Sequence, residues 1–250
     1  MNRYIFDVDG TLTESVNGMH PRFMRFFEGW IKYNSTYLCT NNDYSSIKTK
    51  LGRKIVENCS GVFCCAANSV YFKGKMIRKQ DYNFNIDLIP FLENKINSTS
   101  FRMKAGPQIT IREGIISFSI LGKTELLRER NMFKSWDREN QERLKIIKEI
   151  NNKFPELHAT LAGDTSIDIT AKSKDKSQVF TYFSNEDTIH YIGNELHNNG
   201  NDSTILEYSK SHGNIKVFPV KKWKDTYDFC EKITIQNRAK KARKGTSAHH

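Results

Sequence analysis

The sequence lacks the long apolar segments that mark membrane-spanning and secreted proteins. Its 250 residues contain no run of eighteen apolar side chains, and the N-terminus has no basic segment followed by an apolar core. We therefore expect neither a transmembrane helix nor a signal peptide, and we interpret the chain as a cytoplasmic protein without a membrane partner. Its 38% apolar and 27% charged residues are typical of a globular protein long enough to bury a sizeable core.

Cysteine is also scarce, and the five cysteines follow no recognisable pattern. Their spacing does not match that of metal ligands, and an odd number cannot all pair as disulfides. Internal repeats and low-complexity tracts are absent as well. The sequence therefore predicts reduced thiols in a core, at Cys39, Cys59, Cys64, Cys65 and Cys230.

Acidic residues are in the minority, since 28 aspartates and glutamates face 39 lysines and arginines, a net charge of +11. A basic surface attracts any anion, so this charge fits a phosphorylated small molecule about as well as a polynucleotide. Much of the excess lies in residues 236–250, which we interpret as a basic tail that ends in the remnant of a tag. We therefore exclude His249 and His250 from metal-site reasoning, and we expect a small phosphorylated partner rather than a nucleic acid.

The first third of the chain alternates apolar strands with helices. This order predicts a parallel sheet, and polar residues should collect at the carboxyl ends of its strands, where ligands bind. The predicted strands span residues 4–6, 36–39 and 61–65, and the predicted helices span 21–33 and 44–51.

Residues 78–163 follow a different sequence pattern, which predicts a hairpin at QITIREGIISFSIL and long charged helices. The first pattern returns after Asp168. We therefore predict an α/β protein with a split core domain, residues 1–77 and 164–235, that carries an inserted α+β domain, residues 78–163. The helices predicted in the second half span residues 86–96, 136–154, 175–183 and 203–210, with a further helix from residue 222, and strands are predicted at 188–192 and 215–220.

Two carboxylates, Asp7 and Asp9, stand in YIFDVDGTLT just where the first apolar strand ends. An ionised group that leaves water needs a partner, a metal ion or hydrogen bonds. A carboxylate pair at the carboxyl end of a predicted parallel strand therefore indicates a chemical role.

The segment DVDGTLT resembles the signature of the haloacid dehalogenase (HAD) superfamily. In its phosphotransferases the first aspartate is the nucleophile, and the second is the general acid/base. The resemblance implies that Asp7 attacks phosphorus, while Asp9 protonates the leaving oxygen and then activates water. YLCTNN resembles the second superfamily motif, which implies that Thr40 and Asn41 bind the transferring phosphoryl group, and Lys176 matches the third motif, whose lysine holds the nucleophile and the phosphate together.

YIGNELHNNGND resembles the fourth motif, which supplies oxygen ligands to Mg²⁺. The resemblance implies that Asp7 contributes a carboxylate, Asp9 its backbone carbonyl and Asn194 a side-chain oxygen, with Asp202 as a further ligand or an anchor. Family members normally carry aspartate where Asn194 stands. Because asparagine brings no charge, we expect the ion to be held less tightly, unless the adjacent Glu195 substitutes for the missing carboxylate.

The order of elements most resembles that of eukaryotic-type phosphomannomutases and related cap-bearing phosphatases. This resemblance covers residues 4–205 and implies a HAD-like Rossmannoid core with an inserted α+β cap. It also implies that Arg112, Lys123, Ser166 and Asp168 hold the substrate.

The departures from the mutases concern their grip on a distal phosphate. The mutases carry arginine at the positions of Lys123 and Ala105, and the forked guanidinium group binds phosphate through two parallel hydrogen bonds. The segment Cys65-Ala66-Ala67 replaces the expected ENG. These losses favour hydrolysis over transfer within a doubly phosphorylated sugar.

We therefore expect a Mg²⁺-dependent phosphomonoester hydrolase that forms an aspartyl-phosphate intermediate. A sugar phosphate and a nucleoside 5′-monophosphate are the two substrate classes, and Phe101, Phe118 and Tyr71 are candidates to stack on a base. Three alternatives remain open: a phosphomannomutase-like mutase, an inactive binding protein marked by Asn194, and a nucleic-acid end phosphatase that uses the basic tail. The sequence leaves the oligomeric state open.

Overall fold

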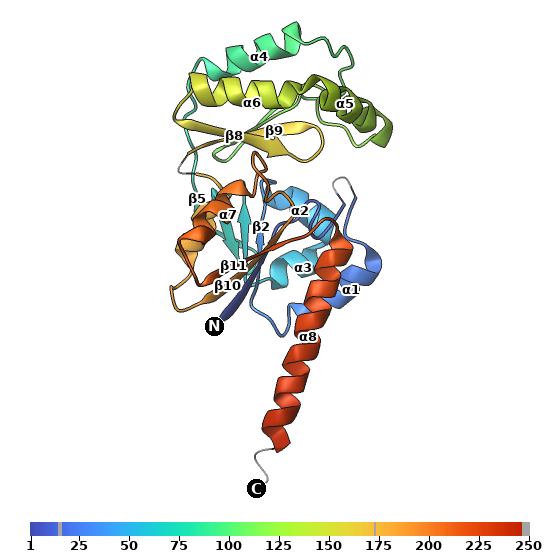
Figure 1. Cartoon of the computed structure of the whole chain (residues 1–250), viewed down its shortest axis with the longest axis vertical. Coiled ribbons are helices and arrows are strands. Elements are labelled where there is room, and N and C mark those ends of the chain that lie inside the picture. Colours follow the sequence, from blue (N-terminus) through green and yellow to red (C-terminus); the bar gives the residue numbers. More distant parts are fainter. Residues whose placement is uncertain (15–16, 173, 247–250) are drawn as a thin grey trace.

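The computed structural model describes residues 1–14, 17–172 and 174–246. Figure 1 shows a lower core and an upper cap, with the C-terminal helix extending below the core. The core contains a seven-stranded sheet in the order β11-β10-β1-β2-β3-β4-β5. Its strands are β1 (Asn2–Phe6), β2 (Thr36–Cys39), β3 (Gly61–Cys64), β4 (Ser69–Phe72), β5 (Lys75–Lys79), β10 (Thr188–Gly193) and β11 (Ile215–Pro219).

Five neighbouring strands of this sheet, from β11 to β3, run parallel, and β4 and β5 add an antiparallel hairpin at one edge. The central strand β1 pairs with β2 on one side and with β10 on the other. After β1 the chain forms β2 and β3 on one side of that strand. It forms β10 and β11 on the other side only after the cap. Such a reversal of strand order is where an open α/β sheet forms its binding crevice.

Both faces of the core sheet are buried at its central strands, because successive side chains of β1 enter different apolar clusters. Phe6 packs with Phe23 and Phe27 on the face covered by α1, α3 and α8, whereas Ile5 packs with Tyr191 on the face covered by η1 and α7. The helical elements are α1 (Pro21–Trp30), α2 (Tyr44–Leu51), α3 (Arg53–Asn58), the 3₁₀ helix η1 (Lys176–Tyr182), α7 (Ser203–Lys210) and α8 (Trp223–Thr246).

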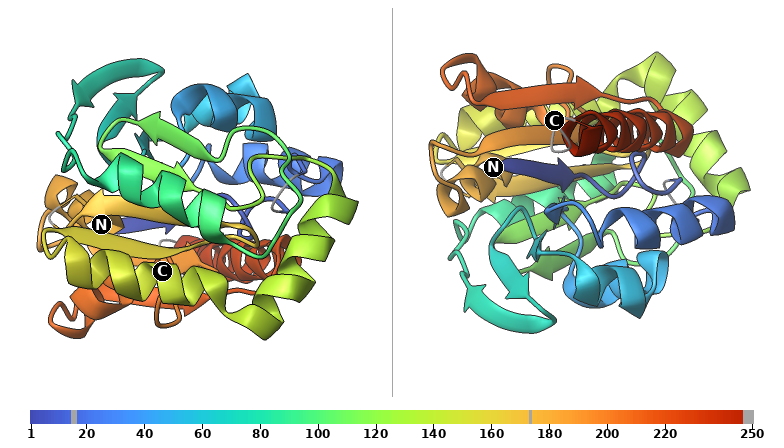
Figure 2. Two further views of the ribbon diagram at one scale, coloured as in Figure 1. Left: turned by 90° about the horizontal axis from the view of Figure 1, so that it is seen from above. Right: turned by 90° about the horizontal axis from the view of Figure 1, so that it is seen from below.

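The cap is a four-stranded antiparallel sheet in the order β6-β7-β9-β8, with three helices on one face. Figure 2 (left) looks down on these helices, which lie in front of the core. Alternate apolar side chains, such as Ile116, Phe118 and Ile167, point into the cap's own core. The elements are α4 (Leu88–Ser98), β6 (Ile109–Arg112), β7 (Ile115–Phe118), α5 (Leu127–Asn140), α6 (Glu142–Lys153), β8 (Leu157–Ala162) and β9 (Ser166–Ala171).

The predicted fold class is confirmed, since a mostly parallel core sheet carries a separate α+β cap. The predicted division between cap and core at residue 163 comes too early. Strand β9 runs to Ala171 and pairs with both β7 and β8 in the cap sheet. β8 and β9 are consecutive strands joined by a short turn, so they pair as a hairpin within the cap sheet. The chain therefore re-enters the core only after β9.

The single predicted helix at residues 136–154 is wrong, because the chain forms α5 and α6 with a break at Gln141. Gln141 adopts φ +53°, and Asp137 accepts hydrogen bonds from the backbone and side chain of Arg143. The predicted helix at 175–183 is the 3₁₀ helix η1.

The C-terminal segment is helical where a separate tail was predicted, since α8 continues through residue 246. The first part of α8 packs on the core through Trp223, Tyr227 and Phe229, and Figure 2 (right) shows the helix end-on. His249 and His250 lie outside the described residues. All five cysteines are buried and free, as predicted, and in the described part of the chain no helix has the length and apolar character needed to cross a bilayer.

Candidate active site

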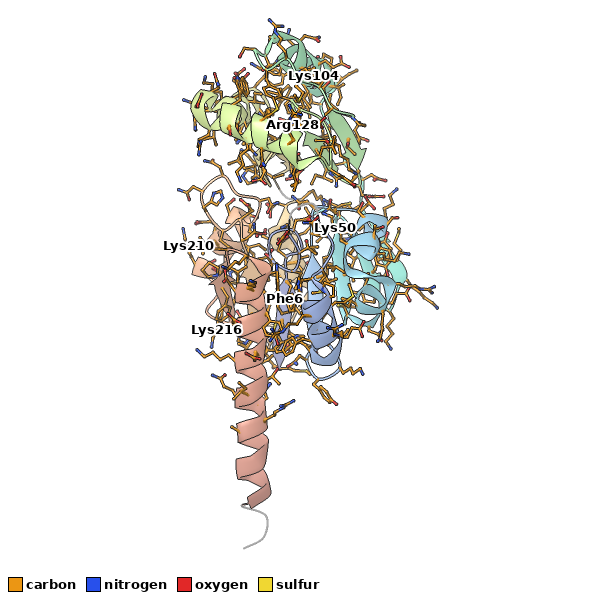
Figure 3. The ribbon with its side chains drawn as sticks, turned by 90° about the vertical axis from the view of Figure 1, so that its right-hand side faces the viewer. Phe6, Lys50, Lys104, Arg128, Lys210 and Lys216 are labelled. Atoms are coloured by element: carbon orange, nitrogen blue, oxygen red, sulfur yellow. The ribbon has the colours of Figure 1, made fainter. Side chains whose placement is uncertain are left out.

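A polar cavity of about 510 Å³ lies between the carboxyl ends of the core strands and the cap sheet. Asp7 follows β1, Thr40 follows β2 and Asn194 follows β10, so three adjacent strands bring these side chains to one edge. Figure 3 shows Lys50 at this upper edge of the core, facing the cap, with Phe6 deeper in the sheet. The strand ends therefore form the floor of the cavity, and the cap forms its roof.

Asp7 is buried, with both carboxylate oxygens hydrogen bonded. Its Oδ1 accepts from Lys176 Nζ at 2.7 Å, and its Oδ2 accepts from Thr11 Oγ1 at 3.2 Å. Burial raises the pKa of Asp7 to about 7, an effect that Lys176 opposes and Asp202 reinforces. Among the described residues, Lys176 is the only cation in a salt bridge with this carboxylate, so it favours the ionised form that a nucleophile needs.

Lys176 also joins Asp7 to Asp202. Its Nζ donates to Asp202 Oδ1 at 2.7 Å and to Asn201 Oδ1 at 3.2 Å, and the side chain is only 1% exposed. Burial disfavours the ammonium, but Asp202 and Asp7 outweigh that effect and hold the pKa of Lys176 above its ordinary value. Helix η1 presents the lysine because Asp175 caps its first turn through the amide of Ser177.

Asp202 is fully buried, and both of its oxygens accept from protein donors. Oδ1 accepts from Lys176 and from Tyr191 OH at 2.7 Å, and Oδ2 accepts from the Glu195 amide at 3.3 Å. Of the two roles predicted for this residue, the geometry fits the anchor. Asp202 holds Lys176 and fixes the loop that follows β10.

The side chains near Asn194 fit a hard cation such as Mg²⁺. Thr11 Oγ1 lies 3.2 Å from both Asp7 Oδ2 and Asn194 Oδ1, so a carboxylate oxygen and an amide oxygen both lie beside this hydroxyl. Asn194 Nδ2 donates to Glu195 Oε1 at 3.1 Å. Among the described residues, no three His, Cys, Asp or Glu side chains cluster, so a cation here would have few charged protein ligands. A few oxygen ligands completed by water suit Mg²⁺, which keeps much of its hydration.

Asp9 reaches the same cavity, with its carboxylate held from two sides. Lys50 of α2 pairs with Oδ1, and Asn42 Nδ2 donates to Oδ2. The sequence analysis missed both partners. Lys50 stands among other lysines in a surface helix, and in the segment Asn41-Asn42-Asp43 only Asn41 had a predicted role.

The loop after β2 touches the cap. Asn41 Nδ2 donates to Asp168 Oδ2 at 2.7 Å, and Arg112 Nη1 donates to the Asn41 carbonyl at 3.2 Å. The Asn41 Oδ1 and Arg112 Nε atoms are buried without a partner among the described residues. One acceptor and one donor of this contact are therefore left unsatisfied among the described residues.

A loop after β3, in the left-handed backbone conformation, forms hydrogen bonds to the loop after β2. Cys65, Ala66 and Ala67 all have positive φ, at 50°, 56° and 65°, which is uncommon for residues with a β-carbon. In this conformation the Ala66 amide donates to the Thr40 carbonyl at 3.0 Å, and the Cys65 amide donates to the Asn42 carbonyl at 3.1 Å. The sequence shows only that this segment departs from the family pattern, since nothing local marks it as left-handed.

All four cap residues predicted to hold a substrate line the cavity, namely Arg112, Lys123, Ser166 and Asp168. The predicted aromatic residues do not. Phe101 and Phe118 are buried in the cap core, and Tyr71 packs against the core domain and stacks on Tyr44. The expectation that they stack on a base is therefore wrong.

Comparison with known proteins gives a consistent assignment. The family profile described as "Eukaryotic phosphomannomutase" matches residues 26–236. The chain is 26% identical over 235 residues to a phosphomannomutase of Dendrobium officinale, covering 91% of this chain and 92% of that protein, and 27% identical over 225 residues to one of Arabidopsis thaliana, covering 86% and 91%.

Solved structures show the same fold at lower identity. An IMP-nucleotidase of Plasmodium falciparum superposes with a TM-score of 0.61 at 14% identity, over 93% of this chain and 68% of that one. A trehalose-6-phosphate phosphatase related protein superposes with a TM-score of 0.57 at 14% identity, over 95% and 99%. The fold is therefore HAD-like.

Proposed function

Since the chain belongs to the eukaryotic phosphomannomutase family, we propose that it is a Mg²⁺-dependent phosphomonoester hydrolase that acts on a sugar phosphate through an aspartyl-phosphate intermediate. The observation that carries this proposal is the buried Asp7, held by Lys176 at 2.7 Å, with Asp9 beside it at the floor of the same cavity. Phosphomonoesters hydrolyse very slowly, and a covalent intermediate divides that reaction into two easier steps.

In the first step Asp7 forms a bond to phosphorus while the bond to the leaving oxygen breaks, and Asp9 gives that oxygen its proton. In the second step a water oxygen bonds to phosphorus, the bond to Asp7 breaks, and Asp9 takes the proton from water. Lys176 favours the ionised form of Asp7 before the first step, and it holds the side chain in place through both steps. When bound, Mg²⁺ supplies positive charge beside the phosphoryl oxygens, and Asp7, Asn194 and the carbonyl of Asp9 would hold it.

The roof of the cavity supports a sugar as the leaving group. Thr110, Ser117 and Asp168 lie side by side on β6, β7 and β9 and all line the cavity. Hydroxyl and carboxylate side chains can hydrogen bond to the hydroxyls of a sugar, because a sugar hydroxyl both donates and accepts. Of the described residues that line the cavity, the only aromatic one is Trp223, on the core side, so nothing in the cap offers a stacking surface for a base.

Hydrolysis is favoured over mutase activity by the cations of the cap. At two positions where the mutases carry arginine, Lys123 is a point charge and Ala105 has no charge, while the guanidinium groups that line the cavity from the cap belong to Arg112 and Arg130. A mutase must hold the distal phosphate of a bisphosphate while it turns. Mutase activity is nevertheless the second candidate, because the family carries that name and Arg112 and Lys123 both face the cavity.

The test follows ³¹P NMR spectra of mannose 1-phosphate, glucose 1-phosphate and a nucleoside 5′-monophosphate with Mg²⁺. We expect inorganic phosphate from the sugar phosphates, loss of turnover in Asp7→Asn, and a fold unchanged by circular dichroism. Appearance of sugar 6-phosphate instead would establish the mutase. Release from the nucleotide alone would overturn the sugar assignment, and no turnover of any ester would leave the inactive binding protein as the correct reading.

A further inference from the structure

We propose that Asn42 couples closure of the cap to the orientation of Asp9, so that the general acid/base is set in place only beneath a closed cap. The proposal rests on the proposed function and adds a positioning residue to it. Asn42 lies on the core loop after β2, between Arg112 of the cap and the carboxylate of Asp9. One amide therefore bridges the two domains.

The two ends of this amide have partners of opposite kinds. Arg112 Nη1 donates to Asn42 Oδ1 at 3.4 Å and to the neighbouring Asn41 carbonyl at 3.2 Å. At the other end Asn42 Nδ2 donates to Asp9 Oδ2. A guanidinium group can only donate and a carboxylate can only accept, so the amide fits between them in one orientation. Arg112 thereby selects the rotamer of Asn42 that holds Asp9.

The backbone of Asn42 is fixed independently of the cap. Its amide donates to Thr40 Oγ1 at 3.2 Å, and its carbonyl accepts from the Cys65 amide at 3.1 Å. The next residue, Asp43, caps α2 by accepting from the Ser46 amide at 2.8 Å. The side chain of Asn42 is therefore the part of this loop that responds when Arg112 arrives or leaves.

The contacts of Asp9 divide between the core and this bridge. Lys50 holds Oδ1 from α2 in the core, so that contact persists whether the cap is open or closed. The Oδ2 contact depends on Asn42, whose outer partner belongs to the cap. When Arg112 withdraws, Asn42 can rotate toward water and Asp9 keeps one fixed oxygen instead of two. Water that reaches an aspartyl-phosphate beneath an open cap then meets a poorly aligned base, and hydrolysis is confined to the closed state.

A second cap contact limits how Arg112 can approach. Asn41 Nδ2 donates to Asp168 Oδ2, so β9 is tied to the residue just before Asn42. Arg112 and Asp168 therefore grip the same loop from two strands of the cap sheet. This pair of contacts makes the arrangement of Asn42 a property of the docked cap as a whole.

The experiment compares a leaving group that needs a proton with one that does not. The probes are a sugar phosphate, whose alkoxide must be protonated, and p-nitrophenyl phosphate, whose phenolate leaves without help. In Asn42→Ala we expect kcat for the sugar phosphate to fall by roughly 10- to 100-fold. The p-nitrophenyl ester should show a rapid burst of one phenolate per enzyme followed by slow turnover, because phosphorylation proceeds while dephosphorylation lacks its base. Asn42→Asp, which keeps the shape but cannot donate to Asp9, is a second variant should the alanine destabilise the loop.

The coupling to the cap is measured by a double-mutant cycle on kcat. Arg112→Ala should slow the wild type more than it slows Asn42→Ala, because its effect on Asp9 passes through that residue. The matched control is Lys123→Ala, another cap cation at the cavity, whose effect should be the same in both backgrounds.

Additive effects of Arg112→Ala and Asn42→Ala, or equal slowing of both esters without a burst, would overturn the proposed coupling through Asn42. Neither result would contradict the proposed phosphatase activity. A wild-type protein that hydrolyses neither ester and forms no phosphoenzyme would overturn both the proposed function and the proposed coupling through Asn42. The two failures are therefore distinguished by the wild type alone.

Discussion

Asp7, Lys176 and Asp202 form a buried trio. Replacing Lys176 by methionine tests whether this trio is held together by charge. The lysine is 1% exposed and is the shared partner of Asp7 and Asp202, each at 2.7 Å. Methionine has a similar length but no charge, so the substitution leaves two carboxylates in a water-poor site. The hydroxyls of Thr11 and Tyr191 still donate to them, yet within the described ranges no cation remains in a salt bridge with either carboxylate.

The expected cost follows from the burial of the pair. Removing one partner of a buried ion pair destabilises a protein by about 3–5 kcal/mol, a large part of a typical stability of about 5–15 kcal/mol. The cost depends on pH, since burial already raises the pKa of Asp7 to about 7 and loss of the lysine raises it further. A carboxyl whose folded pKa exceeds its unfolded value of about 4 binds its proton more tightly when folded. The variant should therefore differ little from the wild type near pH 4 and lose stability progressively as the pH rises through 7.

The assay is urea unfolding at several pH values with a chelator present, so that no divalent ion replaces the lost charge. The midpoint should fall at pH 8 with an unchanged m-value. Adding Asp202→Asn to the variant should recover part of the loss because one buried charge disappears, while Lys172→Met, an exposed neighbour, is the control. A midpoint that is independent of pH, or no recovery in the double variant, would refute the assignment of this trio as a unit held together by charge.

Three further predictions concern the metal, the cap and a helix break. Asn194→Asp should lower the Mg²⁺ concentration for half-maximal activity roughly tenfold or more, and a rise instead would show that Glu195 already supplies the charge. Arg112→Ala and Lys123→Ala should raise KM for the sugar phosphate far more than for p-nitrophenyl phosphate, and equal losses on both esters would contradict their place in substrate binding. Gln141→Gly should stabilise the protein by about 0.5–1 kcal/mol in thermal unfolding, since glycine adopts φ +53° without strain. An unchanged or lower Tm would contradict that estimate.

The part of the site that lies at strand ends could be predicted from the sequence. Asp7, Thr40 and Asn194 each follow an apolar run, and parallel strands bring such positions to one edge whatever the loops between them do. The chemistry assigned to them came from the resemblance of short motifs, each confined to a few neighbouring residues. Local patterns were sufficient here because the geometry is set by the sheet.

The parts that could not be predicted depend on contacts between distant segments. Asn41 and Asp168 are far apart in sequence, and their bond exists only because the cap folds back over the core. Lys50 reaches Asp9 from a helix whose lysines otherwise look like a solvated face. The break at Gln141 has no glycine or proline to mark it, since it is stabilised by the contacts of Asp137 with Arg143. No period or motif in the sequence carries such information.

Under the proposed function, the charges around Asp7 make an asparagine at 194 compatible with catalysis. Asp7 and Asp202 share one ammonium group, so the buried trio has one surplus negative charge before any ligand binds. A divalent ion would reverse that sign, and a phosphate dianion would then reverse it again. Counting only the trio, residue 194 and the ion, the net charge would be zero with aspartate at 194, whereas with Asn194 it would be positive until substrate arrives. If the proposed function holds, Asn194 would transfer part of the metal's stabilisation to the substrate, and we expect metal and substrate to bind cooperatively.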